Sequence, residues 1–385
     1  MSDFFQHGLI STLHRLTEKS LIPDAGLSGA KLGLLLPCHF REIGTQALVN
    51  TIETLNCLRL FDHVIVSVNG VETPDKVVQF WSSLHLAHTI VWNDSPEFWA
   101  WLRQHNLTAI PGKGLNLWSG FGFALTQTNL KTLVIHDCDI LNYQAELPIS
   151  LAIPIAQLGY QFCKGFYSRV RQQLYGRVTR LFVIPFVRAL VRTLGHMPLL
   201  DFLDSFRYPL AGECALSIAM AADLSVEHGW AVEVGWLCEI HRLIDPQQIC
   251  QVDLAMRYDH KHQTLDPKHP EQGLLGMVTD LALSILTHME QEGAELEPET
   301  LESVATGYKQ TASDVIHRYR NVALFNRLPF DEDQEHETAS WFRQRLEDAI
   351  DRFNQGIRAQ SLPPWNQLLP KASFPVEALG MVGMP

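Results

Sequence analysis

The chain has 385 residues, enough for one large domain or for one domain with an appendage. Hydrophobic residues make up 46% of it, a proportion that fits a globular protein able to bury a substantial core. The formal net charge of −12 argues against a general nucleic-acid-binding protein, because such proteins present a basic surface to the phosphate backbone.

Positive charge is nevertheless concentrated in one segment. No acidic residue occurs between Glu146 and Asp201. The basic residues within that segment are Lys164, Arg169, Arg171, Arg177, Arg180, Arg188 and Arg192. A basic segment in an acidic protein suggests a small anionic ligand, although anionic lipid would be attracted by the same charge.

The cysteines and the N-terminus indicate the compartment. The seven cysteines are scattered and form no Cys-x-x-Cys pair, as is typical of a reducing compartment without a zinc or disulfide framework. The first residues lack the basic and apolar regions of a signal peptide. Prolines and arginines interrupt the two most apolar stretches, 147–162 and 181–200, so neither predicts a membrane span. We therefore expect a cytoplasmic protein.

The first part of the chain alternates predicted helices and strands. Residues 1–30 carry apolar side chains at helical spacing and predict an N-terminal helix. The elements predicted after it are, in order, strand 31–37, helix 46–60, strand 63–68, helix 76–86 and strand 89–92. This alternation predicts a doubly wound α/β sheet.

Two aspartates, Asp137 and Asp139, follow the apolar run 133–135, which predicts a buried strand. In open α/β sheets, ligands bind at the carboxyl ends of the strands. Two carboxylates there suit a divalent cation that holds a diphosphate, because Mg²⁺ and Mn²⁺ take carboxylates together with substrate phosphate oxygens. The tripeptide alone fits two solvated acids at a strand end somewhat better than a metal site.

Three other patterns suit anionic or polar ligands. Lys113 lies between two glycines before a predicted helix, where glycine permits close backbone approach and the helix N-terminus favours an anion. The sequence Gly-Arg-Val-Thr at 176–179 opens a helix predicted at 180–194 and can bind one phosphate or carboxylate. Glu233 lies in an apolar strand or helix start, where a carboxylate needs a sugar hydroxyl, a cation or a structural arginine. An exposed turn, a simple helix cap and a structural ion pair are the alternatives.

The second half of the chain begins with a strand predicted at 161–167 and a loop at 210–214 that leads into a helix. The strand predicted at 249–258 is followed by His260 and His262, which would point to opposite sides of an extended chain. Only one of these histidines is therefore expected to reach a metal. Amphipathic helices predicted at 274–289, 301–320 and 337–354 would cover the sheet or form a dimer contact.

In this order the motifs resemble the retaining GT-A glucosyl-3-phosphoglycerate synthase family. The resemblance spans about residues 31–277 and rests on Leu-Leu-Pro at 35–37, Pro-Gly-Lys-Gly at 111–114, Asp-Cys-Asp at 137–139, Lys-Gly-Phe-Tyr-Ser-Arg at 164–169, Gly-Arg-Val-Thr at 176–179, Pro-Leu-Ala-Gly-Glu at 209–213, Val-Glu-Val-Gly at 232–235 and Gln-Val-Asp-Leu at 251–254. It implies a GT-A type doubly wound, mostly parallel sheet with helices on both faces. The domains expected are an N-terminal helical segment at 1–30, a catalytic domain at 31–265 and a helical C-terminal region at 266–385.

The resemblance also implies an activity and a ligand set. A metal-dependent glycosyltransferase would move glucose from UDP-glucose to 3-phosphoglycerate with retention, giving glucosyl-3-phosphoglycerate for the synthesis of the compatible solute glucosylglycerate. Residues implied in nucleotide-sugar binding are Pro37, Asn69, Lys113, Asp137, Leu210, Glu233 and Arg257. Those implied in acceptor binding are Gly176, Arg177, Val178, Thr179 and His262. Asp139 and His260 would hold Mg²⁺ or Mn²⁺, and Asp139, Lys113 and Glu233 would be catalytic. We also expect a homodimer.

This sequence departs from the family pattern in two places. The family tends to carry acidic residues after the first strand, where this chain has residues 38–42. The segment 257–260 is one residue longer than in the family, so the metal ligand is either His260 or His262.

Other functions remain open on the sequence. The donor could be GDP-mannose or GDP-glucose, the acceptor could be glycerate, or the protein could bind a sugar nucleotide without turning it over. An aspartate-nucleophile phosphatase would need threonine or valine where this chain has Leu141.

Overall fold

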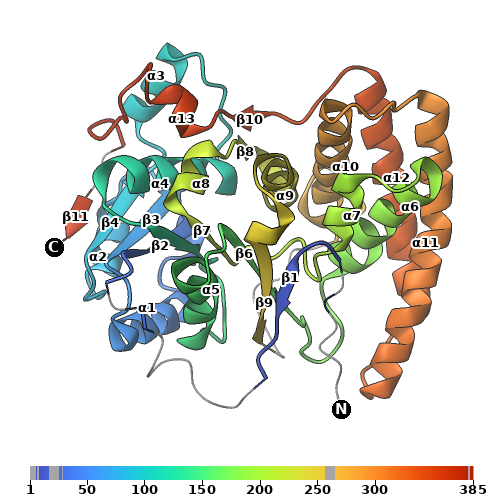
Figure 1. Cartoon of the computed structure of the whole chain (residues 1–385), viewed down its shortest axis with the longest axis horizontal. Coiled ribbons are helices and arrows are strands. Elements are labelled where there is room, and N and C mark those ends of the chain that lie inside the picture. The colour runs from blue at the N-terminus through green and yellow to red at the C-terminus, as the bar shows by residue number, and fades with distance from the viewer. Residues whose placement is uncertain are drawn as a thin grey trace.

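The computed structural model describes residues 6, 8–16, 26–27, 29–255, 265–379 and 382–384. Within these ranges, one nine-stranded sheet has the order β1-β9-β6-β7-β5-β2-β3-β4-β11 (Figure 1). Its strands are β1 (Ser11–Leu13), β2 (Leu32–His39), β3 (His63–Asn69), β4 (His88–Trp92), β5 (Thr132–Ile135), β6 (Phe162–Tyr167), β7 (Cys214–Ser217), β9 (Ile249–Ala255) and β11 (Val382–Met384).

Most neighbouring strands of this sheet are parallel, which confirms the doubly wound arrangement predicted from the sequence. The antiparallel members are β7, which lies between β5 and β6, and β11, which pairs with β4. Strand β7 corrects the sequence analysis, which expected the 210–214 loop to lead directly into a helix. The strand 214–217 is only four residues long, and such short segments do not distinguish a strand from a buried helical turn. The expected helix follows as α8 (Ile218–Asp223).

The predicted N-terminal helix is wrong for the residues that the structure describes. Ser11–Leu13 instead form β1, which pairs in parallel with β9, with Ser11 opposite Cys250. The side-chain amide of Gln251 donates to the hydroxyl of Thr12 at 3.0 Å and ties the two strands together. Pairing with a strand 239 residues away along the chain thus overrides the helical spacing of the local apolar residues.

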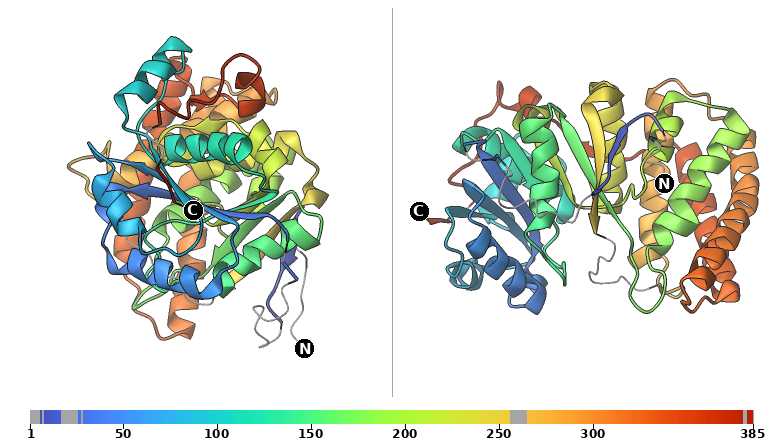
Figure 2. Two further views of the ribbon diagram at one scale, coloured as in Figure 1. Left: turned by 90° about the vertical axis from the view of Figure 1, so that its left-hand side faces the viewer. Right: turned by 60° about the horizontal axis from the view of Figure 1, so that its bottom comes forward.

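Helices cover both faces of the sheet (Figure 2). One face packs against α1 (Gln46–Leu58), α2 (Asp75–Trp81) and α5 (Glu146–Gln157). The other packs against α3 (Pro96–Gln104), α4 (Lys113–Gln127), α8 and α9 (Val232–Leu243). A small two-stranded sheet pairs β8 (Val226–Glu227) with β10 (Ser361–Leu362), and α13 (Trp365–Leu368) follows β10. These layers place the carboxyl ends of the central parallel strands beside the first turns of α4 and α9.

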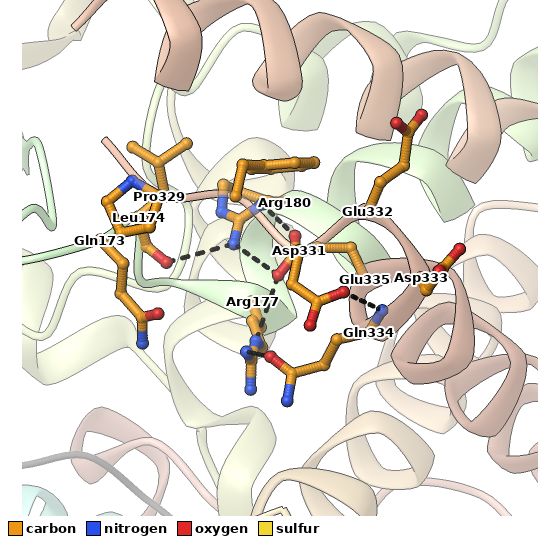
Figure 3. A pocket seen from close by; sticks show the side chains of 11 residues that line it. Gln173, Leu174, Arg177, Arg180, Pro329, Asp331, Glu332, Asp333, Gln334 and Glu335 are labelled. Carbon is orange, nitrogen blue, oxygen red and sulfur yellow. Dashed lines mark hydrogen bonds and ion pairs between the residues drawn. The ribbon is translucent and has the colours of Figure 1, made fainter. Parts of the chain in front are cut away.

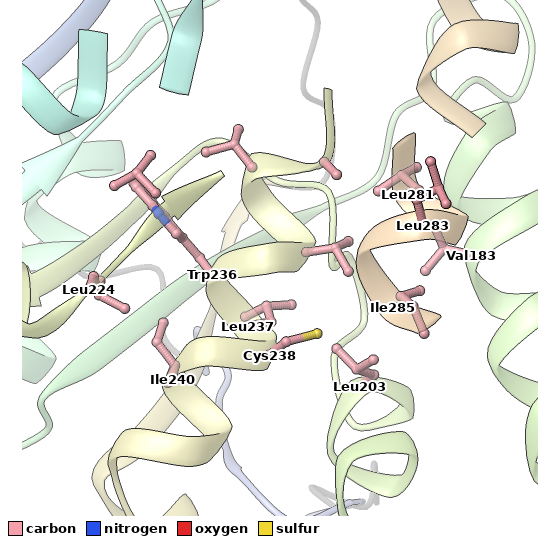
Figure 4. Packing of buried hydrophobic residues seen from close by; sticks show 14 of the residues in the cluster. Val183, Leu203, Leu224, Trp236, Leu237, Cys238, Ile240, Leu281, Leu283 and Ile285 are labelled. Carbon is pink, nitrogen blue, oxygen red and sulfur yellow. The ribbon is translucent and has the colours of Figure 1, made fainter. Parts of the chain in front are cut away.

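A helical layer packs beyond α9, on the right of Figure 1. It consists of α6 (Ile184–Leu194), α7 (Pro198–Asp204), α10 (Gly273–Gln291), α11 (Pro298–Phe325) and α12 (Glu332–Asn354). Figure 4 shows side chains of α9, such as Leu237 and Cys238, on the side that faces Leu281 of α10 and Leu203 of α7. The three predicted C-terminal helices are therefore confirmed. Among the described residues, no helix is both long and apolar enough to cross a bilayer.

A buried polar cluster joins α9 and α10 to β8. The Glu227 carboxylate accepts from the Ser284 hydroxyl at 2.9 Å and lies 2.8 Å from Nε2 of His288. Nδ1 of His288 lies 3.8 Å from the Glu239 carboxylate. A carboxylate at this depth is stable only while its oxygen atoms have hydrogen-bonding partners. The cluster therefore fixes α10 to α9 and β8.

We expect Ser284→Ala to lower the free energy of unfolding by about 1–3 kcal/mol, because it removes a donor to a buried carboxylate. Urea denaturation followed by circular dichroism measures this change. Ser303→Ala is the matched control, because Ser303 lies on the exposed side of α11 and its hydroxyl donates to the carbonyl of Glu299 in its own helix. Its effect should stay within about 0.5 kcal/mol. Equal unfolding curves for the two variants would contradict a stabilising role for the cluster.

Candidate functional site

The carboxyl ends of β2, β3 and β5 open into a pocket with a volume of about 890 Å³. The predicted site residues that line it are Pro37, Asn69, Lys113, Asp137, Asp139, Gly176, Arg177, Val178, Thr179, Leu210 and Glu233. The predicted Arg257, His260 and His262 lie outside the described residues. The fold thus brings every described candidate to one pocket, and their individual roles stay predictions.

Lys113 forms the electrostatic centre of this pocket. It is the first residue of α4, and its Nζ lies 2.5 Å from Asp137 Oδ1 and 2.8 Å from Glu233 Oε1. Desolvation alone would lower the pKa of Lys113, but the two carboxylates outweigh it and hold that pKa well above its usual range. Lys113 therefore remains positively charged at the pH values at which proteins usually work.

Two glycines permit the close approach of backbone around Lys113. A Cβ on Gly212 would lie 2.4 Å from Asp137 Oδ2 and 2.6 Å from Lys113 Nζ, so a larger residue there would displace the paired ends of these two side chains. Gly112 precedes α4 at φ +153°, and a Cβ there would meet no atom within 4 Å. The backbone at the N-terminus of α4 is consequently open to the pocket, where its N–H groups favour an anion.

Residues of the C-terminal segment pack against α4. The Trp118 ring stacks on that of Trp365 with centroids 4.1 Å apart. Nε1 of Trp118 donates to the Pro363 carbonyl at 2.8 Å, and Nε1 of Trp365 donates to the Trp118 carbonyl at 2.7 Å. Aromatic burial of this kind stabilises a fixed geometry, and here it fixes the helix that carries Lys113.

A chain of amide side chains supports the Pro37 and Asn69 side of the pocket. The Nδ2 of Asn116 donates to Asn69 Oδ1 at 2.9 Å and to the Cys38 carbonyl at 3.1 Å. The Nδ2 of Asn93 in turn donates to Asn116 Oδ1 at 2.9 Å and to the Ser67 hydroxyl at 2.8 Å. This network fixes Asn69 at the end of β3. No sequence pattern indicated Asn93 and Asn116, because their hydrogen-bonding partners lie on other elements.

Asp139 is partly buried and lies in a negatively charged environment. Burial, together with the nearby carboxylates of Asp137, Glu213 and Glu42, raises its pKa to about 7, because the opposing positive charge of Lys113 is too weak to offset them. A divalent cation would supply the missing positive charge, and carboxylate oxygens are the ligands that Mg²⁺ and Mn²⁺ prefer. Asp139 thus fits a cation. Within the described ranges, no group of three or more histidine, cysteine or acidic side chains could hold a metal, so the other ligands must come from substrate, water or residues beyond those ranges.

The predicted acceptor segment, 176–179, lies on another side of the pocket. Gly176 has φ +71°, which a larger residue would adopt only with strain. Thr179 begins a π-helical turn (Thr179–Val183) that leads into α6, so the helix predicted from 180 is regular only from Ile184. The Thr179 hydroxyl is buried and has no hydrogen-bonding partner within the described structure. A buried, unsatisfied hydroxyl beside a π-helical turn is typical of a ligand site.

Several pocket residues were not identified from the sequence. They are His39, Arg41, Glu42, Asp94, Asn116, Tyr167, Arg169, Tyr175, Tyr208, Trp230, Glu271 and Asp280. Tyr167 donates to the Glu213 carboxylate at 2.8 Å, and Nη1 of Arg169 lies 3.4 Å from the Tyr208 hydroxyl. Tyr167 and Arg169 belong to a motif that the sequence analysis had noted without assigning a role to either side chain. Asp280 lies on α10, and no sequence pattern near it indicated that it would line the pocket.

No family model matches the chain. The glucosyl-3-phosphoglycerate synthase of Persephonella marina is 33% identical to it over 366 residues, covering 92% of this chain and 91% of that protein. The synthase of the same name from Methanococcoides burtonii is 30% identical over 387 residues, covering 95% of this chain and 94% of that protein.

Solved structures confirm the expected GT-A type fold. Glucosyl-3-phosphoglycerate synthase from Mycobacterium tuberculosis in complex with Mn²⁺, UDP and phosphoglyceric acid matches with a TM-score of 0.53 at 23% identity, covering 75% of this chain and 88% of that chain. The complex of that enzyme with Mg²⁺ and UDP matches with a TM-score of 0.52 at 24% identity, covering 73% and 86% of the two chains. By its sequence identity to curated relatives over almost its whole length, this chain belongs to the glucosyl-3-phosphoglycerate synthase family.

Proposed function

We propose that this protein transfers glucose from UDP-glucose to 3-phosphoglycerate and forms glucosyl-3-phosphoglycerate. The observation that carries the proposal is the pocket itself: Lys113 at a helix N-terminus, Asp139 at a strand end and the 176–179 segment all line it. These groups supply sites for a diphosphate, a cation and a second anion in one cavity. Family membership favours this reaction, since the two curated relatives carry that name.

Negative charge develops on the diphosphate as the nucleotide leaves the sugar. Lys113 retains its proton and would stabilise negative charge on the departing diphosphate, as would the N–H groups at the start of α4. Asp139 and His260 or His262 would hold Mg²⁺ or Mn²⁺, and the cation, when bound, neutralises diphosphate charge. Pro37, Asn69, Asp137, Leu210 and Arg257 would bind the rest of the nucleotide sugar.

Glu233 would bind the transferred sugar. Its carboxylate is 12% exposed and is held by Lys113, in the first turn of α9, which favours its negative charge. A carboxylate in that ion pair suits hydrogen bonding to sugar hydroxyls better than nucleophilic attack. We therefore propose a same-face reaction with retention, in which a leaving phosphate oxygen helps to deprotonate the acceptor hydroxyl. Residues 176–179 and His262 would bind the acceptor.

Family membership also bears on the alternatives. It favours a transferase over an aspartate-nucleophile phosphatase, and the joint presence of Lys113 and Asp139 in the pocket favours an active enzyme over an inactive binding protein. GDP-mannose, GDP-glucose and glycerate remain as competing substrates. The homodimer, the cytoplasmic location and the domain boundaries stay predictions.

A matrix of donors and acceptors tests the proposed reaction. UDP-glucose, GDP-glucose and GDP-mannose are each combined with 3-phosphoglycerate or glycerate in the presence of Mg²⁺ or Mn²⁺, and the products are measured by mass spectrometry. We expect the highest kcat/KM for UDP-glucose with 3-phosphoglycerate and no turnover in excess EDTA. A higher kcat/KM for a GDP-sugar or for glycerate would overturn the substrate assignment.

Asp139→Asn should lower kcat by at least about 100-fold, because loss of one electrostatic contact to a transition state typically has an effect of that size. Burial disfavours the charge of Asp139, so we expect the variant to unfold at a temperature no lower than that of the unaltered protein. Calorimetry should also show weaker Mn²⁺-dependent binding of UDP. Near-normal turnover would contradict the metal site.

Lys113→Met should lower kcat/KM for UDP-glucose by roughly 100-fold, since it removes the permanent positive charge beside the diphosphate. Steady-state kinetics with saturating 3-phosphoglycerate measures the effect. Lys131→Met is the control, because Lys131 is exposed and lies just before β5, at the end of the strand opposite the pocket. If both variants lost activity equally, a specific role for Lys113 would be excluded.

A further inference from the structure

A second cavity, with a volume of about 560 Å³, adjoins the acceptor side of the main pocket (Figure 3). Gln173 and Arg177 line both cavities. The far wall of the second cavity belongs to residues 329–335, which lead into the first turn of α12. A helix of the C-terminal region therefore reaches the segment that would bind the acceptor.

Arg177 is held by two consecutive residues of that first turn. Its Nε donates to Glu335 Oε1 at 3.2 Å, and its Nη2 donates to Gln334 Oε1 at 2.7 Å. Figure 3 shows both side chains of α12 directed at the guanidinium. Within the part of the chain that is described, these bonds leave the Nη1 group of Arg177 available to a ligand. The Arg177 side chain is 25% exposed and lines the main pocket as well as the second cavity.

Glu335 is itself fixed by a second arginine. Nη1 of Arg180 donates to Glu335 Oε2 at 2.6 Å, and Nε of Arg180 donates to the Tyr175 carbonyl at 2.9 Å. The Glu335 side chain is 7% exposed and that of Arg180 is 6% exposed. A charge-assisted bond in this environment has well-defined geometry, because neither partner can exchange freely with water. Glu335 is consequently a rigid support for Arg177.

We propose that Glu335 of α12 is a positioning residue for the acceptor: it orients the Arg177 guanidinium so that Nη1 faces the acceptor's anionic group. Gln334 contributes to the same orientation from the exposed side. Planar, two-point recognition of phosphate or carboxylate by arginine depends on the plane of the guanidinium, and two bonds along one edge determine that plane. The inference rests on the proposed function, because it concerns the acceptor side of that site.

The test compares steady-state constants of the full-length protein with those of Glu335→Gln and Gln334→Ala. Glu335→Gln should raise KM for 3-phosphoglycerate by about tenfold, and Gln334→Ala by about two- to threefold, as expected for the loss of bonds that only orient a charged group. KM for UDP-glucose and kcat at saturating acceptor should stay within about twofold. If Glu335 had a purely structural role, its loss would not raise KM for 3-phosphoglycerate while leaving KM for UDP-glucose unchanged.

Glu332→Gln is the matched control. It removes the same charge from the same turn of α12, but Glu332 is 43% exposed and pairs with Arg320 at 3.0 Å instead of with Arg177. Its kinetic constants should not change. If Glu335→Gln does not fold, as thermal unfolding would show, Gln334→Ala provides the test, because Gln334 bonds to Arg177 whereas the buried Arg180 is paired with Glu335.

Three results would overturn the inference while leaving the proposed function intact. These are an unchanged KM for 3-phosphoglycerate, a lowered KM, which would make Glu335 a competitor of the acceptor, and a parallel rise of both KM values. Failure of the unaltered protein to glucosylate 3-phosphoglycerate would instead overturn the proposed function, so the two failures are distinguishable.

Discussion

The ion pairs of Lys113 with Asp137 and Glu233 are the interaction on which the site depends. The three residues come from the start of α4, the end of β5 and the first turn of α9, so the site forms only when the sheet and both helices are assembled. The ammonium group of Lys113 pairs with two carboxylates, and the carboxylate of Asp139 lies nearby. The pocket therefore holds more negative than positive charge. This imbalance makes the same cavity suitable for a cation together with a diphosphate.

The features that the sequence predicted well have local causes. An apolar run followed by acids identified β5 and its aspartates, because a strand buried on both faces is continuously apolar. Glycines on both sides of Lys113 marked the start of a helix that presents its N–H groups to a ligand. The C-terminal helices were found from their amphipathic spacing alone. Each of these signals lies within one element and needs no knowledge of its neighbours.

The features that the sequence did not predict depend on contacts between distant segments. Strands β1 and β7 are short, and only their pairing with other strands defines them. Asn93 and Asn116 are ordinary polar residues until the fold brings them beside Asn69. Glu335 belongs to the acidic first turn of α12. In the sequence, acidic residues at a helix start indicate only a favourable interaction with the helix dipole. The bonds of Glu335 to arginines more than 150 residues away are a property of the tertiary structure.

The two outermost described strands of the large sheet, β1 and β11, are each three residues long and come from opposite ends of the chain. Short edge strands offer few free backbone groups to a neighbouring molecule and so discourage intermolecular strand addition. During synthesis, however, β4 emerges from the ribosome almost three hundred residues before β11, so its outer edge stays uncovered for most of translation. Nascent or truncated chains would therefore be more prone to aggregate than the finished protein.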